Sequence, residues 1–211
     1  MTPAGAPHIL ITGFGPFPGA PANPAASLAR DLARLRRPAL AGTRRSLRIL
    51  PTLWEQAAGF PSTLDAFAPD IVLMIGLAAR RRAVSIEWLG RNHTRLLPDA
   101  ARRHPSERRF EAGSAAIRRG GFDAAPLLQA LAVAGLPARL SRDAGGYVCN
   151  ALAWSAYGWA RQGGARRLAV FVHIPRPRAG GRLDRGRMLR GLGNLMVALV
   201  AQHRLRVAVA R

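Results

Sequence analysis

The sequence has no lysine and a single cysteine, and it lacks any long hydrophobic run. One cysteine cannot form a disulfide within the chain, so the fold does not depend on an oxidising compartment. No apolar run approaches the roughly 20 residues that a membrane span requires. The N-terminus also lacks the basic and apolar regions of a signal peptide. We therefore expect a cytoplasmic protein with no membrane partner.

Several motifs that carry common chemistries are also missing. There is no CxxC, no HExxH and no close group of histidine and aspartate, so we expect no metal. The loop "GFGPFPG" has neither the Walker pattern nor the GxGxxG spacing, and a GxSxG elbow is absent. The sequence therefore argues against a phosphate-binding loop and offers no GxSxG nucleophile elbow.

Arginine carries the whole basic excess, and the formal net charge is +21. Such a charge can bind nucleic acid by neutralising phosphates. The alternative is an ordinary solvated surface on which arginine replaces lysine. The arginines occur in short separate runs, such as Arg80-Arg81-Arg82, without the interleaved aromatic residues of a stacking platform. Nucleic-acid binding is therefore the less favoured alternative.

Short apolar runs alternate with helical patterns along all 211 residues. We expect strands at His8–Thr12, Ser46–Leu50, Asp70–Ile75, Val84–Leu89, Ala138–Ser141 and Leu168–Ile174. We expect helices after Asn23, over Leu53–Phe67 with an interruption near Pro61, and over Ala124–Ala134, Val148–Arg161 and Asp184–Gln202. The arginine-rich segment 91–121 fits neither pattern. This alternation predicts one domain over residues 1–211, a three-layer α/β/α sandwich with a twisted, mostly parallel but mixed sheet.

Cys149 stands at the start of an expected helix, directly after the Gly145-Gly146 turn and Tyr147-Val148. Backbone N–H groups at a helix N-terminus favour a thiolate by lowering its pKa, and they can bind an oxyanion. The alternative is that this lone cysteine is only a small buried hydrophobic residue. Position alone leaves both interpretations open.

Two further residues could serve a cysteine nucleophile. His173 ends an apolar strand 24 positions after Cys149, so one helix and one returning strand bring both to the same edge of the sheet. A base within hydrogen-bond reach is what such a nucleophile needs, although His173 could also be a satisfied core residue. Glu87, in "AVSIEWLG", could orient the imidazole of His173, or it could face solvent on an edge strand.

Several segments, in one order along the chain, resemble the pyroglutamyl peptidase I family of cysteine peptidases. They are "ILITGFGPFPGAPANPA", "LPT", "PDIVLMIGLAARRRAVSIEWL", "AGLPARLSRDAGGYVCN" and "FVHIP". The resemblance implies a phosphorylase/hydrolase-like sandwich in which Cys149 is the nucleophile, His173 the general base and Glu87 the orienting acid. It also implies a cofactor-free cytoplasmic enzyme that removes an N-terminal pyroglutamyl residue from peptides, as a dimer or tetramer.

The resemblance further implies where the substrate binds. Pyroglutamate is an uncharged lactam, for which Phe14, Phe17, Tyr147 and Val148 can supply apolar walls. Core packing is the alternative role of Phe14 and Phe17. Asn23 can hydrogen-bond the substrate backbone, or cap the helix that begins at Pro24, or do both.

The chain departs from the family pattern beside this site. Leu77 takes the place of a glutamine, and Ala79-Arg80 takes the place of two glycines. Arg81 aligns with the family arginine that follows those glycines. The same fold and triad could therefore act on other N-blocked or cyclic amides, or have lost activity.

Overall fold

The computed structural model describes residues 6–210 and contains a six-stranded sheet in the order β2-β1-β3-β8-β4-β7. Its strands are β1 (His8–Phe14), β2 (Arg44–Leu50), β3 (Ile71–Leu77), β4 (Val84–Glu87), β7 (Ala138–Ser141) and β8 (Leu168–Ile174). A separate antiparallel pair joins β5 (Leu89–Arg91) to β6 (Ile117–Arg119). The first five residues, on which the expected lack of a signal peptide partly rests, lie outside the described residues.

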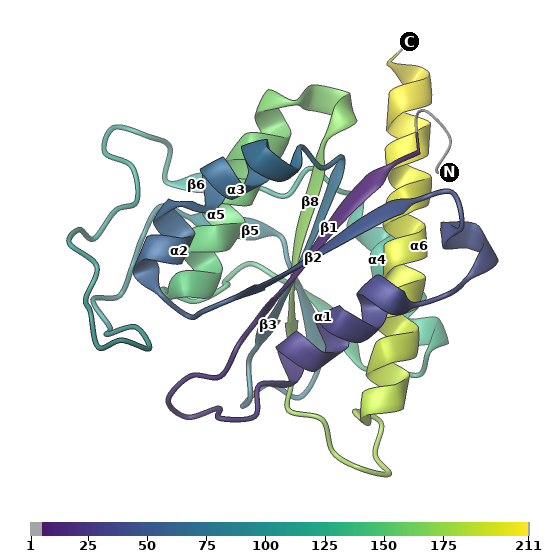
Figure 1. Ribbon diagram of the computed structural model, residues 1–211, viewed down its shortest axis with the longest axis horizontal. Helices are drawn as coiled ribbons and strands as arrows, with labels where there is room; N and C mark the ends of the chain where they lie inside the picture. The colour runs from purple at the N-terminus through teal and green to yellow at the C-terminus, as the bar shows by residue number, and fades with distance from the viewer. Residues whose placement is uncertain (1–5, 211) are drawn as a thin grey trace.

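Helices cover both faces of the sheet (Figure 1). They are α1 (Pro24–Arg34), α2 (Trp54–Ala58), α3 (Phe60–Phe67), α4 (Ala124–Val133), α5 (Val148–Gln162) and α6 (Arg185–Val209). Helices α1, α4 and α6 pack together on one side, and α2, α3 and α5 pack together on the other. None of these helices, all within residues 6–210, combines the length and the apolar character of a membrane span.

The sheet is mixed, and the expected three-layer α/β/α fold is confirmed. Strands β2, β1, β3 and β8 are parallel, β4 runs antiparallel to β8, and β7 is parallel to β4. Every residue of β1 and β8 is buried, as is almost all of β3. Their continuous apolar runs are what strands covered on both faces require.

Two expected elements are each divided in the structure. The helix expected over 53–67 breaks at Gly59, and Pro61 lies in the first turn of α3, where a missing N–H is tolerated. The strand expected over 84–89 ends at Glu87, and the chain continues into β5, which packs against α5. A Cβ at Gly90 would lie 2.7 Å from the backbone nitrogen of Trp154, so only glycine permits this approach.

The expected helix cap at Asn23 is confirmed, and Asp184 caps the last helix in the same way. Asn23 Oδ1 accepts a hydrogen bond from the N–H of Ala25, and Asp184 Oδ1 accepts one from Arg187. The last helix extends beyond the expected Gln202 to Val209. The unassigned segment 91–121 contains β6 and is otherwise turns and irregular chain.

Candidate active site

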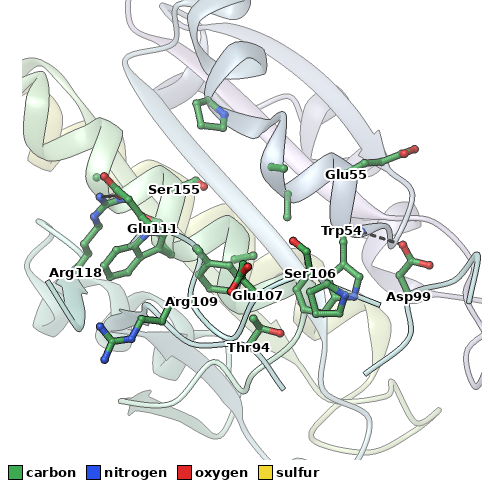
Figure 2. Close-up of a pocket in the computed structure, with 18 of the residues that line it drawn as sticks. Trp54, Glu55, Thr94, Asp99, Ser106, Glu107, Arg109, Glu111, Arg118 and Ser155 are labelled. Carbon is green, nitrogen blue, oxygen red and sulfur yellow. Dashed lines mark hydrogen bonds and ion pairs between the residues drawn. The ribbon is translucent and has the colours of Figure 1, made fainter. Parts of the chain in front are cut away.

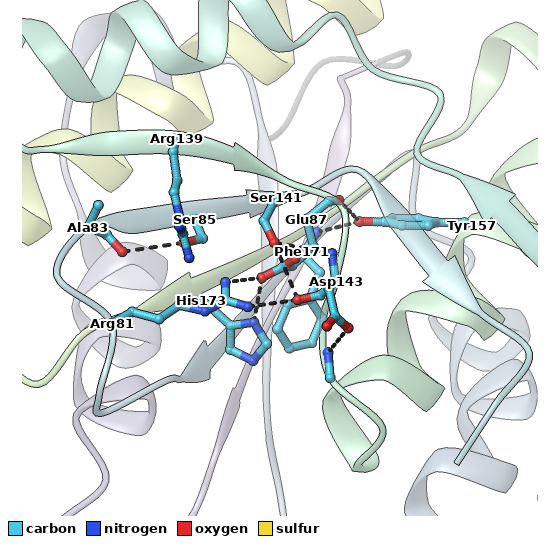
Figure 3. Close-up of polar contacts among 11 residues, drawn as sticks. Arg81, Ala83, Ser85, Glu87, Arg139, Ser141, Asp143, Tyr157, Phe171 and His173 are labelled. Atoms are coloured by element: carbon cyan, nitrogen blue, oxygen red, sulfur yellow. Dashed lines mark hydrogen bonds and ion pairs between the residues drawn. The ribbon is translucent and has the colours of Figure 1, made fainter. Parts of the chain in front are cut away.

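His173 and Glu87 meet on one face of the sheet. Because β4 is antiparallel to β8, Ser85 lies opposite His173 and Glu87 lies opposite Phe171, which makes Glu87 a diagonal neighbour of the histidine. His173 Nδ1 is 2.7 Å from Glu87 Oε1 (Figure 3). The histidine is almost fully buried and Glu87 is completely buried. Glu87 therefore does not face solvent on an edge strand.

Neighbouring residues pack closely around the imidazole of His173. The ring centroids of Phe171 and His173 are 4.9 Å apart. A Cβ at Gly76, opposite His173 on β3, would lie 2.8 Å from the Phe171 ring and 3.1 Å from His173 Cδ2. Tyr157, on α5, donates its hydroxyl hydrogen to the carbonyl of Glu87 and accepts the N–H of Phe171. Tyr157 thus holds the backbones of Glu87 and Phe171 in place from α5.

Arg81 completes the group around the carboxylate. Its Nη1 donates to Glu87 Oε1, the oxygen that also contacts His173, and its Nη2 donates to the carbonyl of Asp143 at 2.7 Å (Figure 3). Glu87 Oε2 has no hydrogen-bond partner among residues 6–210. Sequence reasoning gave Arg81 no role, although its position six residues before Glu87 could have suggested a pairing.

Cys149 is the second residue of α5 and is partly exposed. Gly145 before it has φ +85°, and a Cβ at Gly146 would lie 2.7 Å from the side chain of Arg95. The turn before Cys149 therefore requires glycine at both positions, for a positive φ at Gly145 and for close packing against Arg95 at Gly146. Within residues 6–210 no hydrogen bond joins the Cys149 thiol to His173. Catalytic hydrogen bonds commonly tighten only when substrate is bound.

The thiol of Cys149 does not have the lowered pKa that its helix position suggested. Although part of the residue is exposed, the protein packed around the sulfur desolvates it, and this, with a smaller effect from the Glu87 charge, raises the pKa of the Cys149 thiol to about 12. The Arg81 guanidinium and the N–H of Cys149 itself act in the opposite direction, but they are outweighed. The expectation was wrong because desolvation disfavours a thiolate here more than the helix terminus favours it. The sulfur keeps its proton at neutral pH.

Asn150 is a structural residue that the sequence analysis missed. It is completely buried, and its amide nitrogen donates to the carbonyls of Arg91 and His93 at 2.8 and 2.9 Å. Its Oδ1 accepts the N–H of Arg91. A polar side chain directly after the cysteine in "YVCN" was the available signal. Asn150 fixes the start of α5 against β5.

The residues expected to bind substrate differ in exposure. Phe14 and Val148 are buried, and the ring centroid of Phe14 lies 6.5 Å from that of Phe171. Phe17 and Leu77 remain partly exposed. The core-packing alternative thus describes Phe14 but not Phe17.

Tyr147 and Asn23 are held by contacts within the protein. Tyr147 is partly exposed, and it donates its hydroxyl hydrogen to the carbonyl of Pro98 at 3.0 Å while its ring packs edge-on against Trp54. Asn23 caps α1 and donates its amide hydrogen to the carbonyl of Gly15 at 3.0 Å. Its capping role is therefore present, and the amide also fixes the loop that follows β1.

A cavity of about 750 Å³ lies beside α5 and the 92–119 segment (Figure 2). Neither Cys149 nor His173 lines it. Five of the chain's eleven carboxylates line it: Glu55, Asp65, Asp99, Glu107 and Glu111. Glu55 pairs with Arg103, Glu111 pairs with Arg118, and Asp99 accepts three backbone N–H groups. Most of its charge is thus matched internally.

In the folded protein several arginines stack on tryptophans, although no aromatic residues lie within the arginine runs of the sequence. The guanidinium of Arg118 lies 3.9 Å from the ring centroid of Trp154, and that of Arg167 lies 4.6 Å from Trp159. One face of each indole is therefore covered by the chain's own cation. This arrangement does not favour these indoles as platforms for nucleic-acid bases.

The comparison with protein families decides the assignment. The family model described as pyroglutamyl peptidase matches residues 7–179. The chain belongs to this family. Pyroglutamyl peptidases are cysteine peptidases, so the chain is a member of a hydrolase family. The match includes Glu87, Cys149 and His173 and ends before α6.

Relatives and solved structures agree with membership in the pyroglutamyl peptidase family. A pyrrolidone-carboxylate peptidase of Chromobacterium violaceum is 33% identical over 79% of this chain and 77% of its own. A pyrrolidone-carboxylate peptidase of Gloeobacter violaceus is 33% identical over 80% of this chain and 81% of its own. The crystal structure of pyroglutamyl peptidase I from Bacillus amyloliquefaciens shares the fold, with a TM-score of 0.80 at 23% identity over 92% and 97% of the two chains.

Proposed function

We propose that the chain is an exopeptidase that hydrolyses the amide bond after an N-terminal pyroglutamyl residue. The observation that carries this proposal is the buried contact between His173 and Glu87, on the sheet face covered by α5, which carries Cys149 in its first turn. A histidine oriented by a carboxylate is the base that a neutral thiol requires. The relatives named pyrrolidone-carboxylate peptidase supply the substrate class.

In the first half of the reaction, Cys149 Sγ attacks the carbonyl carbon that joins pyroglutamate to the next residue. Because the thiol is protonated at neutral pH, its proton moves to His173 Nε2 as the sulfur attacks. Nε2 is the available ring nitrogen, since Nδ1 contacts Glu87. The Glu87 carboxylate stabilises the imidazolium, and the N–H groups at the start of α5 stabilise the oxyanion.

In the second half, the imidazolium gives its proton to the leaving amine as the carbon–nitrogen bond breaks. A thioester between Cys149 and the pyroglutamyl group remains. His173 then removes a proton from water as the water attacks the thioester. Collapse of that intermediate releases pyroglutamate and returns the proton to the sulfur. The residues named are sufficient for this sequence without a cofactor or a metal.

We also propose that the uncharged lactam binds beside the loop that follows β1. Phe17, Leu77 and Tyr147 offer partly exposed apolar surface, which supports their role as walls. Phe14 and Val148 would support those walls from the core, and Asn23 would hold the loop in place.

A second candidate keeps the same mechanism but takes other N-blocked or cyclic amides. The supporting observation is Leu77, which ends β3 opposite Ile174 with an aliphatic side chain and no amide to bond a lactam. The exposed cation of Arg80 nearby would favour acidic neighbouring groups on such substrates.

The test is hydrolysis of a fluorogenic pyroglutamyl amide, with Cys149→Ala as the inactive control. A prolyl amide, which has the same ring without the lactam carbonyl, is the matched substrate. We expect the wild type to cleave only the pyroglutamyl amide. Equal cleavage of several blocked amides would favour the second candidate, and a wild type no faster than Cys149→Ala would remove both.

The remaining expectations also stay proposals. We propose a cytoplasmic enzyme formed by one hydrolase domain over residues 1–211, and the single core cluster from Ile9 to Val200 supports that division. We propose a homo-oligomer, either a dimer or a tetramer. Light scattering on the purified protein measures its mass directly, and a monomer would contradict the oligomer.

A further inference from the structure

The Arg81 side chain joins the buried carboxylate to the segment that leads to the cysteine. One nitrogen donates to Glu87 Oε1, and the other donates to the carbonyl of Asp143, six residues before Cys149. The arginine therefore touches the acid and the loop of the nucleophile at once. Its side chain is 20% exposed, in contrast with the exposed arginines on either side of it.

The turn that carries Arg81 is itself fixed to the histidine strand. The N–H of Ala78 donates to the carbonyl of Ile174, which directly follows His173, at 2.8 Å. The N–H of Arg81 then donates to the carbonyl of Ala78 at 2.9 Å, which closes the turn. Movement of the guanidinium relative to His173 is thus restricted by backbone contacts.

The charge of Arg81 has a specific task at this place. Glu87 is completely buried, and a buried carboxylate without a partner is costly. His173 can supply a positive charge only when protonated, but it must be neutral before the thiol gives up its proton. An arginine is charged at every working pH, so it can compensate the carboxylate while the histidine stays neutral.

The charged and titratable groups around His173 come from four elements. Glu87 lies on β4, Arg81 on the turn after β3, and Cys149 on α5. Arg139, on β7, reaches the same face through Ser85 Oγ at 3.3 Å. Among these groups Glu87 is the negative one, and both arginines are positive.

We propose that Arg81 is a positioning residue, which compensates the buried charge of Glu87, holds this side chain in line with His173 and ties both to the segment before the nucleophile. This inference rests on the proposed function, because the role only matters if His173 is the base. Arg81 needs no contact with the substrate for it.

Removal of the Arg81 cation should change the pH at which the pair of His173 and Glu87 binds a proton. His173 and Glu87 share a contact, so their protons bind to the pair as a unit. Without Arg81 the pair takes up a proton at higher pH, whichever of the two carries it. The acid limb of the kcat/KM profile should therefore move to higher pH.

The experiment compares Arg81→Met and Arg81→Lys with Arg82→Met. We expect Arg81→Met to lower kcat by about tenfold or more and to move the acid limb upward. Arg81→Lys keeps the charge, so its limb should stay near that of the wild type while kcat falls less. Arg82→Met removes the same charge at an exposed position next to Arg81 and should match the wild type.

A readout without turnover separates this inference from the proposed function. In the Cys149→Ala protein, the His173 imidazole is titrated by NMR, assigned against His173→Gln, with and without Arg81→Met. An upward shift of the midpoint supports the positioning role even if no amide is hydrolysed. An unchanged midpoint, or the same shift in Arg82→Met, overturns it even if activity falls. Thermal unfolding confirms that each variant is folded.

Discussion

Histidine and carboxylate side chains meet at both ends of the sheet, but their surroundings differ. At one end, His173 contacts the fully buried Glu87 beside a permanent cation. At the other end, Asp70 Oδ2 accepts the backbone N–H of His8 at 2.7 Å, and Asp70 Oδ1 lies 3.9 Å from His203 Nε2. The carboxylate of Asp70 is 39% exposed, so water can compensate its charge.

The second group therefore stabilises the structure without any evident chemistry. His8 bonds Ser46 on the neighbouring strand at 2.9 Å, and His203 bonds the carbonyl of Arg166 at 3.1 Å. These contacts tie β1, β2 and α6 together at the edge where the parallel strands begin. Under the proposed function, the same residue types serve as base and orienting acid at the opposite end, where the carboxylate is buried and Cys149 lies in the first turn of the covering helix. Burial and neighbours, more than residue type, separate the two ends.

The largest expected effect on activity comes from replacing one histidine at each end of the sheet with glutamine. His173→Gln should lower kcat/KM for the pyroglutamyl amide by about a thousandfold or more, because it removes the proton acceptor. His203→Gln can still donate to the carbonyl of Arg166 and should leave kcat/KM within about twofold of the wild type. Comparable losses in the two variants, both folded by circular dichroism, would erase the functional difference between the ends.

The reactivity of the sulfur gives the next effect. With a thiol pKa of about 12, Cys149 has about a thousandfold less thiolate at pH 8 than a cysteine with the usual value of 9.0. Its alkylation by iodoacetamide should rise about tenfold per pH unit from pH 8 to 10 without a plateau. Glu87→Gln removes a charge that raises this pKa, so alkylation at pH 8 should become faster. A plateau near pH 7 in the wild type would contradict the protonated thiol.

A smaller effect tests the fit around the imidazole. In Gly76→Ala the added Cβ would collide with Phe171 and crowd His173, which should cost about 1–3 kcal/mol of unfolding free energy and reduce kcat. The matched control is Gly42→Ala, whose Cβ would meet Arg204 at an ordinary 3.6 Å. Urea unfolding of both variants measures the difference. Equal stability of the two would show that the site can relax around a methyl group.

The sequence could predict the layers and most elements, because buried strands and capped helices leave local patterns. The apolar run before Gly76 and the caps at Asn23 and Asp184 were of this kind. The interruption expected near Pro61 is present at Gly59, but the division after Glu87 was missed, because tertiary contacts rather than local preference decide it. Candidate residues could be chosen by strand ends, but the contact of Arg81 with Glu87 depends on how a turn folds back. The thiol pKa was missed for a related reason, since burial is a property of the whole fold.

The smallest expected effect concerns the structural end of the sheet. Burial and the neighbouring Arg44 guanidinium hold the pKa of His8 below its usual 6.5. The unfolded chain then binds a proton near pH 6.5 while the folded chain resists it, so stability falls as the pH drops below about 6.5. His8→Gln keeps the backbone N–H for Asp70 and removes this proton, so it should lose less stability between pH 7.5 and 5.5 than the wild type does. Urea midpoints at the two pH values measure the loss, with the exposed His104→Gln as control. If His8→Gln and the wild type lose the same amount, His8 is not a source of acid sensitivity, and the two ends of the sheet differ less in proton binding than their burial suggests.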